Sequence, residues 1–168
     1  MAPKVLLPAL LIWIGLSSAA VAMPESMQNL RLKDQNELPV KISANIRYVL
    51  FAHDMSSKDL VQDMLENKPA DYLETHHALF VADVSGMPRI IARMFAYPAL
   101  RKLPYQVLLD EVGSRTADWE RRDSAVTLFR VDNFVVTGFD FIDTQEALED
   151  ALNEIPPEAP AVPDNITE

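Results

Sequence analysis

The amino-acid sequence predicts an α/β fold with a mixed central sheet and helices on both of its faces, in three layers (α/β/α). Two runs of β-forming residues, 46–52 and 78–84, are each followed by a helical pattern, as in parallel β-α-β units. Residues 124–141 form a β-hairpin pattern, and a helical pattern follows it directly. The predicted order is β-α-β-α-β-loop-β-β-α, with a parallel start and a C-terminal antiparallel hairpin plus helix.

The composition is that of one globular domain with its own core. Of 168 residues, 49% are hydrophobic and 24% are charged. The formal net charge of −10 argues against nucleic acid or an anionic membrane as a partner. The chain has no cysteine, which excludes thiol catalysis, disulfide exchange, cysteine-ligated zinc and iron–sulfur clusters. We expect no cofactor.

Residues 1–22 have the three parts of a signal peptide. Lys4 supplies the positive charge, residues 5–16 are an apolar core, and small residues precede a cleavage site with Ala20 and Ala22 in an A-x-A pattern. We expect cleavage after Ala22, which leaves no stable membrane span. A short signal without a lipid-attachment cysteine is typical of a bacterial periplasmic protein, so we predict a periplasmic location.

The first β-α unit follows a polar lead-in segment, residues 23–45, which contains a short strand near 40–42. Residues 46–52 carry only one charge and are predicted to be a buried strand. Ser56 and Asp59 have the spacing of a capping box and predict the start of a helix. Its apolar stripe is formed by Leu60, Val61, Met64 and Leu65, and Asn67 and Pro69 end it.

The second β-α unit consists of a buried strand at 78–84 and a helix that begins at Pro88. We expect Pro98 to end or kink this helix. A third strand is predicted at 106–110, and a polar loop, 111–123, follows it with Trp119 as its one large apolar group. The predicted buried face of the helix is formed by Ile90, Ile91, Met94 and Phe95.

The C-terminal hairpin is predicted to turn at Asp132-Asn133, because both residues tolerate positive φ. Asp143, with Glu146 three residues later, is predicted to cap the last helix. Residues 156–168 are rich in proline and acidic residues and predict a disordered tail. The predicted buried face of the last helix is formed by Ala147, Leu148, Ala151 and Leu152.

Three stretches carry a resemblance to a known family: QVLLDEVG at 106–113, the spacing from there to Trp119, and the run at 124–152. Their pattern resembles the thioredoxin-like superfamily, in the branch of peroxiredoxin-like and periplasmic thioredoxin-like proteins. It is also similar to small cysteine-less periplasmic members whose function is not established. The resemblance implies a thioredoxin-like domain over residues 46–155.

The chain departs from the redox members of that superfamily in two places. Those members carry Cys-x-x-Cys or a peroxidatic cysteine in the loop after the first strand, where this chain has HDMSSK at 53–58. They also carry a cis-proline before the penultimate strand, where this chain has Ser124-Ala125-Val126. We therefore expect neither thiol oxidoreductase nor cysteine peroxidase activity.

The same two places predict a binding site. His53 and Asp54 lie where a parallel strand meets its helix, the edge at which open α/β sheets place ligands, and we expect Asp123 and Ser124 opposite them. We predict an exported, non-catalytic protein that binds another exported protein or a peptide there. A turn with a helix cap would account for the same residue types without any binding. The candidate binding residues are His53, Asp54, Met55, Ser56, Ser57, Asp123 and Ser124.

Two alternatives remain open. His53 with His76 and His77 would form a metal site if the fold brought them together, because imidazole suits zinc or copper. Adjacent histidines before a strand point in opposite directions, which argues against this set. The other alternative is a structural accessory subunit. A Ser124–His53–Asp123 hydrolase is disfavoured because the chain has no G-x-S-x-G nucleophile elbow.

Overall fold

The computed structural model describes residue 24 and residues 26–154. The predicted signal peptide (1–22) and the predicted tail (156–168) lie outside the described residues. In the part of the chain that is described, no helix is long and apolar enough to cross a membrane.

One seven-stranded mixed sheet organises the described chain, with the strand order β2-β1-β5-β4-β3-β6-β7. β3, β4 and β5 are parallel to one another, whereas β6 and β7 form an antiparallel hairpin beside β3. This confirms the predicted parallel start and terminal hairpin. The strands are β1 (Leu32–Asp34), β2 (Pro39–Val40), β3 (Tyr48–Ala52), β4 (Ala78–Asp83), β5 (Val107–Asp110), β6 (Val126–Asp132) and β7 (Val135–Ile142).

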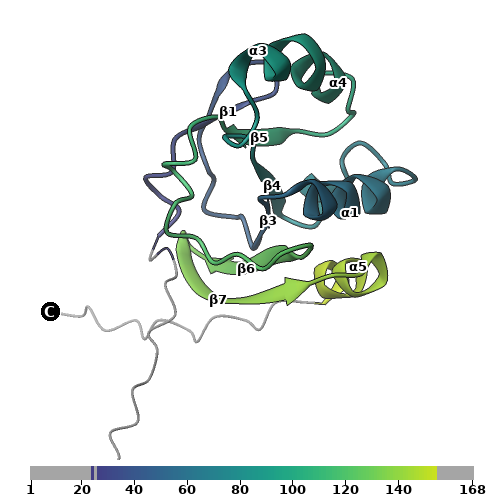
Figure 1. The fold of residues 1–168 in the computed structure, drawn as a ribbon. Helices are drawn as coiled ribbons and strands as arrows, with labels where there is room; N and C mark the ends of the chain where they lie inside the picture. Colours follow the sequence, from purple (N-terminus) through teal and green to yellow (C-terminus); the bar gives the residue numbers. More distant parts are fainter. Residues whose placement is uncertain (1–23, 25, 155–168) are drawn as a thin grey trace, which may run out of the picture.

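The helices pack on one face of this sheet. Figure 1 shows α1, α3, α4 and α5 on the same side of the strands. Their buried side chains join a single core with alternate residues of the strands, such as Leu50, Phe80 and Leu128. The helices are α1 (Met55–Leu65), α2 (Tyr72–Thr75), α3 (Arg89–Ile91), the π-helix η1 (Ala92–Ala96), α4 (Tyr97–Leu100) and α5 (Gln145–Asn153).

The opposite face is covered by irregular chain, which corrects the expected third layer of helices. Phe51 and Phe129 point to this face, because side chains alternate along a strand. Trp119 from the loop after β5 meets both rings edge-on, at centroid distances of 4.9 Å from Phe51 and 5.1 Å from Phe129. Met27 from the N-terminal segment completes this second core.

The predicted lead-in segment contributes two strands to the sheet. β1 pairs antiparallel with β5, and β2 pairs with β1. The buried Gln35 side chain extends this pairing, since its amide donates to the Tyr105 carbonyl at 2.8 Å and accepts from Val107 N–H at 2.9 Å. Residues 32–40 therefore belong to the same sheet as the strands that follow.

Local boundaries differ from the sequence prediction by one or two residues. Asp54, not Ser56, is the N-cap of α1, and Thr144, not Asp143, is the N-cap of α5. In α5, Ala147 is exposed. The hairpin turns at Asn133 and Phe134, which have φ of 44° and 71°. Caps and turns depend on backbone hydrogen bonds, which the residue pattern alone does not specify.

The helix between β4 and β5 faces the opposite way from the prediction. The small Ala92 and the ring of Tyr97 are buried against the sheet. The helix continues through Pro98 to Leu100, because η1 widens the turn before it and Tyr97 N–H donates to the Ala92 carbonyl. The residues predicted to be buried are all exposed: Ile90, Ile91, Met94 and Phe95.

The buried Asp110 carboxylate holds the loop that covers the second core. One oxygen accepts the N–H of Gly113 at 2.8 Å, and the other accepts the N–H groups of Arg115 and Thr116 at 2.9 Å. Gly113 has φ of +75°, and a Cβ there would lie 2.5 Å from Ser85 Oγ. The conformation of the loop thus depends on the Asp110 side chain, which accepts backbone N–H groups that have no backbone carbonyl partner in the described part of the chain.

We expect Asp110→Asn to lower the free energy of unfolding by about 1–3 kcal/mol, because an amide nitrogen cannot accept the N–H groups that one carboxylate oxygen now accepts. Urea unfolding followed by far-UV circular dichroism measures this. Asp118→Asn, at an exposed position of the same loop, is the matched control and should leave stability unchanged. Equal stability of the two variants would contradict the role assigned to Asp110.

Candidate functional site

The strand register brings together the two parts of the predicted binding site. β3 ends at Ala52, so His53 and Asp54 follow at its carboxyl end. β6 runs antiparallel to β3 with Phe51 opposite Thr127, so the residues before β6 lie beside the end of β3. We call residues 53–57 together with Asp123 and Ser124 the candidate edge.

Asp54 and Ser57 form a reciprocal capping box at the start of α1. Asp54 Oδ1 accepts the Ser57 N–H at 2.7 Å, and Ser57 Oγ accepts the Asp54 N–H at 3.2 Å. Ser57 is fully buried. Of the predicted binding residues, Ser57 is therefore part of the helix cap, whereas Met55 and Ser56 are exposed on the first turn of α1.

The second oxygen of Asp54 joins α1 to the segment before β6. Asp54 Oδ2 accepts the Ser124 N–H at 2.7 Å. Ser124 has φ of 60°, a left-handed conformation that costs energy for a residue other than glycine and that this hydrogen bond helps to hold. Burial alone would raise the pKa of the Asp54 carboxyl, but hydrogen bonds from Ser124 and Ser57 outweigh burial and lower it.

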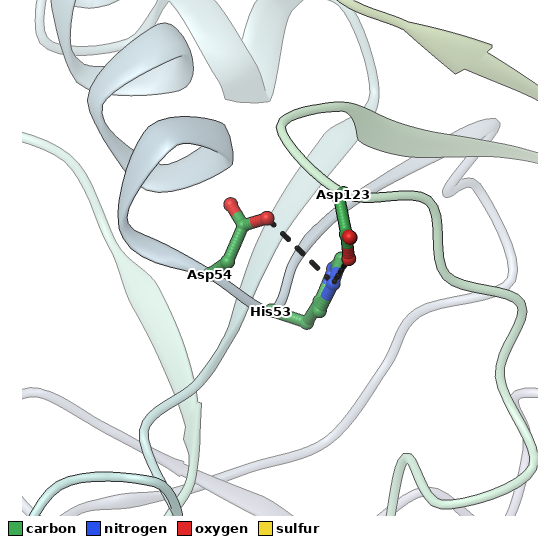
Figure 2. Close-up of side chains that lie close together, drawn as sticks. All are labelled: His53, Asp54 and Asp123. Carbon is green, nitrogen blue, oxygen red and sulfur yellow. Dashed lines mark ion pairs between the residues drawn. The ribbon is translucent and has the colours of Figure 1, made fainter.

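His53 lies between the two carboxylates of the candidate edge, as Figure 2 shows. Its Nε2 is 3.7 Å from Asp54 Oδ2 and 3.9 Å from Asp123 Oδ1. The imidazole is 14% exposed, whereas Asp123 is fully exposed. Among the described residues, none offers the buried Nδ1 a hydrogen bond. One imidazole and two carboxylates within 4.8 Å are a ligand set that a divalent cation such as zinc can use.

The structure separates the histidines of the metal hypothesis, so that set is wrong. The carbonyl of His77 accepts the N–H groups of Arg47 and Tyr48 at the start of β3, the opposite end from His53. A strand of five residues spans about 17 Å. Both ring nitrogens of His76 are already engaged, by the Tyr72 carbonyl at 2.7 Å and by Asn153 Oδ1 at 3.1 Å.

Asp83 and Arg121 extend the polar groups of this edge, and sequence reasoning missed both. Asp83 ends β4, the strand parallel to β3, so its position at the same edge could have been inferred. Arg121 Nη2 donates to Asp83 Oδ2 at 3.1 Å, and its guanidinium lies over the Phe51 ring at 5.1 Å. Burial raises the pKa of the Asp83 carboxyl, but hydrogen bonds from Ser85 and Arg121 prevail and lower it.

An apolar groove, which no pattern in the sequence indicates, adjoins the candidate edge at Met55. It has a volume of about 180 Å³ and lies between α1 and the helix that ends in α4. Lys58 also lines this groove, and burial lowers the pKa of its ammonium group. We call it the α1–α4 groove; its apolar lining includes Met55, Phe80, Val84, Met87, Ala99 and Leu100.

A larger hollow, of about 510 Å³, lies at the opposite end of the sheet and includes His77. It is at the amino ends of β3 and β4, because Ala78 begins β4. Ligand sites of open α/β sheets lie at the carboxyl ends of the strands, so the candidate edge is the better supported site.

Comparisons with known proteins identify the fold. No protein-family model and no curated protein matches this sequence. Among solved structures, the exposed lipoprotein thioredoxin of Streptococcus pneumoniae strain TIGR4 is similar with a TM-score of 0.50 and 15% identity, over 74% of this chain and 98% of that chain. Peroxiredoxin Q of Xanthomonas campestris has a TM-score of 0.50 and 9% identity, over 74% and 90%. An uncharacterized thioredoxin-like protein from Porphyromonas gingivalis has a TM-score of 0.48 and 14% identity, over 79% and 90%.

The fold is thioredoxin-like. These identities support the fold alone. Within a thioredoxin-like fold, this chain has no cysteine anywhere, so no thiolate is present for disulfide exchange or peroxide reduction. The loop after β3 carries instead the His53–Asp54 pair, and the segment before β6 carries Ser124 in a left-handed conformation. The geometry of the edge therefore offers binding groups without the thiol chemistry.

We expect Asp54→Asn to lower the free energy of unfolding by about 1 kcal/mol at neutral pH, because an asparagine still caps α1 but its amide nitrogen cannot accept the Ser124 N–H. The folded-state pKa of Asp54 is lowered, so its contribution is present above the unfolded pKa and is lost as the pH falls through the folded pKa. The difference between the two proteins should thus shrink below about pH 4.

Chemical unfolding between pH 3 and pH 8 tests this dependence. Asp123→Asn is the matched control at the same edge, since its fully exposed carboxylate caps no helix. A stability difference for Asp54→Asn that stayed constant down to pH 3 would rule out the proposed role of its charge.

Proposed function

We propose that this protein is an exported, non-redox thioredoxin-like protein that binds a protein or peptide segment at the candidate edge. The observation that carries the proposal is the α1–α4 groove, which shares Met55 with that edge. Met55 belongs to both features, because it is on the first turn of α1 and lines the groove while remaining largely exposed.

The size of the groove favours a peptide side chain as its occupant. Pockets for drug-sized molecules and cofactors are roughly 300–1,000 Å³. The α1–α4 groove, at about 180 Å³, is smaller and holds one or two apolar side chains of a larger ligand. Because Met55 belongs to both the groove and the candidate edge, a segment that placed one side chain in the groove would continue along that edge.

The charges of the edge select the polar part of such a ligand. Asp123 is fully exposed and Asp54 is partly exposed, and both carboxylates face the same imidazole. Carboxylates accept hydrogen bonds and attract cations. A segment with an apolar residue next to a basic residue or a free amide therefore fits this edge.

Export is the second part of the proposal. It is supported by the signal-peptide pattern over residues 1–22 and by the similarity to a pneumococcal thioredoxin described as an exposed lipoprotein. A bacterial periplasm is the compartment that fits a cleavable signal without a lipid-attachment cysteine.

A photo-crosslinking amino acid at position 55, introduced in the native host, should capture a defined partner that mass spectrometry identifies. Ala99→Trp, which fills the groove, should reduce that capture several-fold, because the partner side chain loses its place. The same probe at the exposed Val135 is the positional control and should not capture this partner. The purified protein should begin at Met23.

Capture at position 55 that Ala99→Trp leaves unchanged would refute the groove as the binding site. A partner that co-purifies in a fixed ratio, but contacts neither position 55 nor the edge, would instead support the structural accessory subunit.

Metal binding is a second candidate function, favoured by the distance of 4.8 Å or less among ligand atoms of His53, Asp54 and Asp123. We expect zinc to raise the melting temperature of the full chain, since a ligand that binds only the folded state stabilises it. His53→Ala should abolish the shift, and His76→Ala, whose ring belongs to another site, should leave it intact. An equal shift in both variants would show that zinc binds elsewhere.

A further inference from the structure

The helix between β4 and β5 exposes a ridge of large apolar side chains. Ile90, Ile91, Met94 and Phe95 are 72%, 44%, 63% and 63% exposed. Their spacing of i, i+1, i+4 and i+5 places them on one side of the helix. No other part of the described chain covers them, although they make up half of its large exposed hydrophobic residues. We call these four residues the apolar ridge.

Basic residues flank this ridge in a chain that is otherwise acidic. Residues 84–109 contain no aspartate or glutamate, but they contain Arg89, Arg93, Arg101 and Lys102. The net charge of the whole chain is −10, so the remainder carries −14 once the +4 of this segment is set apart. Positive charge is thus concentrated on the segment that bears the ridge.

These cations are available to a partner. Arg89, Arg93 and Lys102 are exposed, and within the described ranges none of them forms an ion pair. Arg101, in contrast, is paired with Glu37 at 3.5 Å. Arg89 and Arg93 are one helical turn apart, so they form a basic margin along the ridge.

We propose that the apolar ridge and its basic margin dock this protein on an anionic lipid surface. A helix with apolar side chains on one side and Lys or Arg beside them lies in the boundary between headgroups and acyl chains. The apolar side chains enter that boundary, and the guanidinium groups meet anionic headgroups. The net charge of −10, which for the chain as a whole argues against an anionic membrane partner, does not govern this local contact, because electrostatic fields in physiological salt decay over about 8 Å.

Shape selects lipid over a second copy, and charge complementarity selects it over an apolar protein partner. A ridge that projects from a helix enters a fluid surface without a matching cleft, and its flanking cations require a partner with dense negative charge. The inner side of the same helix lines the α1–α4 groove through Ala96, Ala99 and Leu100. Docking would therefore hold the groove close to the lipid surface.

Single-cysteine labelling tests the proposal on the full chain, since the natural sequence has no cysteine. Met94→Cys carries an environment-sensitive fluorophore at an exposed position of the ridge. On addition of phosphatidylglycerol vesicles its emission should shift to the blue, and phosphatidylcholine vesicles should give a much weaker response. Ala147→Cys is the matched control on α5, at the other edge of the sheet from α3 (Figure 1), and should not shift.

The cationic margin has its own test with the same label. Arg89→Gln with Arg93→Gln should weaken the vesicle response roughly 25-fold, because each basic residue near an anionic surface contributes about a fivefold gain in binding. Lys33→Gln with Lys41→Gln is the control pair from the exposed residues of another segment and should change little. Added salt should weaken the response of the natural sequence.

Three results would overturn the proposal. The first is an unchanged Met94 label on phosphatidylglycerol vesicles, and the second is an equal shift at position 147, which would indicate attachment through another part of the chain. The third is a blue shift without vesicles that rises with protein concentration, which would show that the ridge binds a second copy. The label reports the polarity around its own position. Insertion of an N-terminal apolar segment into the bilayer would therefore not produce a blue shift at position 94 without one at position 147.

Discussion

The buried carboxylate of Asp110 is the interaction on which much of this structure depends. Asp110 ends β5, and its carboxylate accepts the backbone N–H groups of the loop that follows. The chain can therefore turn back across the sheet without a helix. That path places Trp119 over Phe51 and Phe129, where it seals the second core. The same path delivers Arg121 to the carboxyl end of β4. The Asp110 side chain thus accepts backbone N–H groups that a helix or strand would otherwise pair.

The candidate edge shows how a thioredoxin-like scaffold is held together without thiols. Asp54 caps α1 with one oxygen and accepts the Ser124 N–H with the other, so one carboxylate joins the two segments of the edge. His53 and the exposed Asp123 are left facing each other at the same edge. Asp123 can therefore be changed without loss of the helix cap, which allows the proposed binding to be tested apart from stability.

One helix carries both proposed surfaces. Its inner side lines the groove through small residues such as Ala96 and Ala99, and its outer side bears the apolar ridge. Because Ala92 and Tyr97 pack on the sheet, the four apolar residues of the ridge remain exposed. A ridge with a basic margin on an acidic protein can orient the molecule, so that ligand binding takes place at a defined distance from lipid.

The sequence by itself determined the mixed sheet, the order of its main strands and helices, and the hairpin with its final helix. These features follow from local periodicity, since alternation and helical stripes are properties of neighbouring residues. Only the tertiary structure decided which side of a helix is buried, and so exposed Phe95 where a core position was predicted. It also separated His76 from His53 and brought Asp123 to it, because strand register acts between residues far apart in the chain. Only the tertiary structure, likewise, shows that Trp119 covers the second face of the sheet. The polar loop that carries Trp119 has no periodic pattern, and the buried Asp110 carboxylate sets its path.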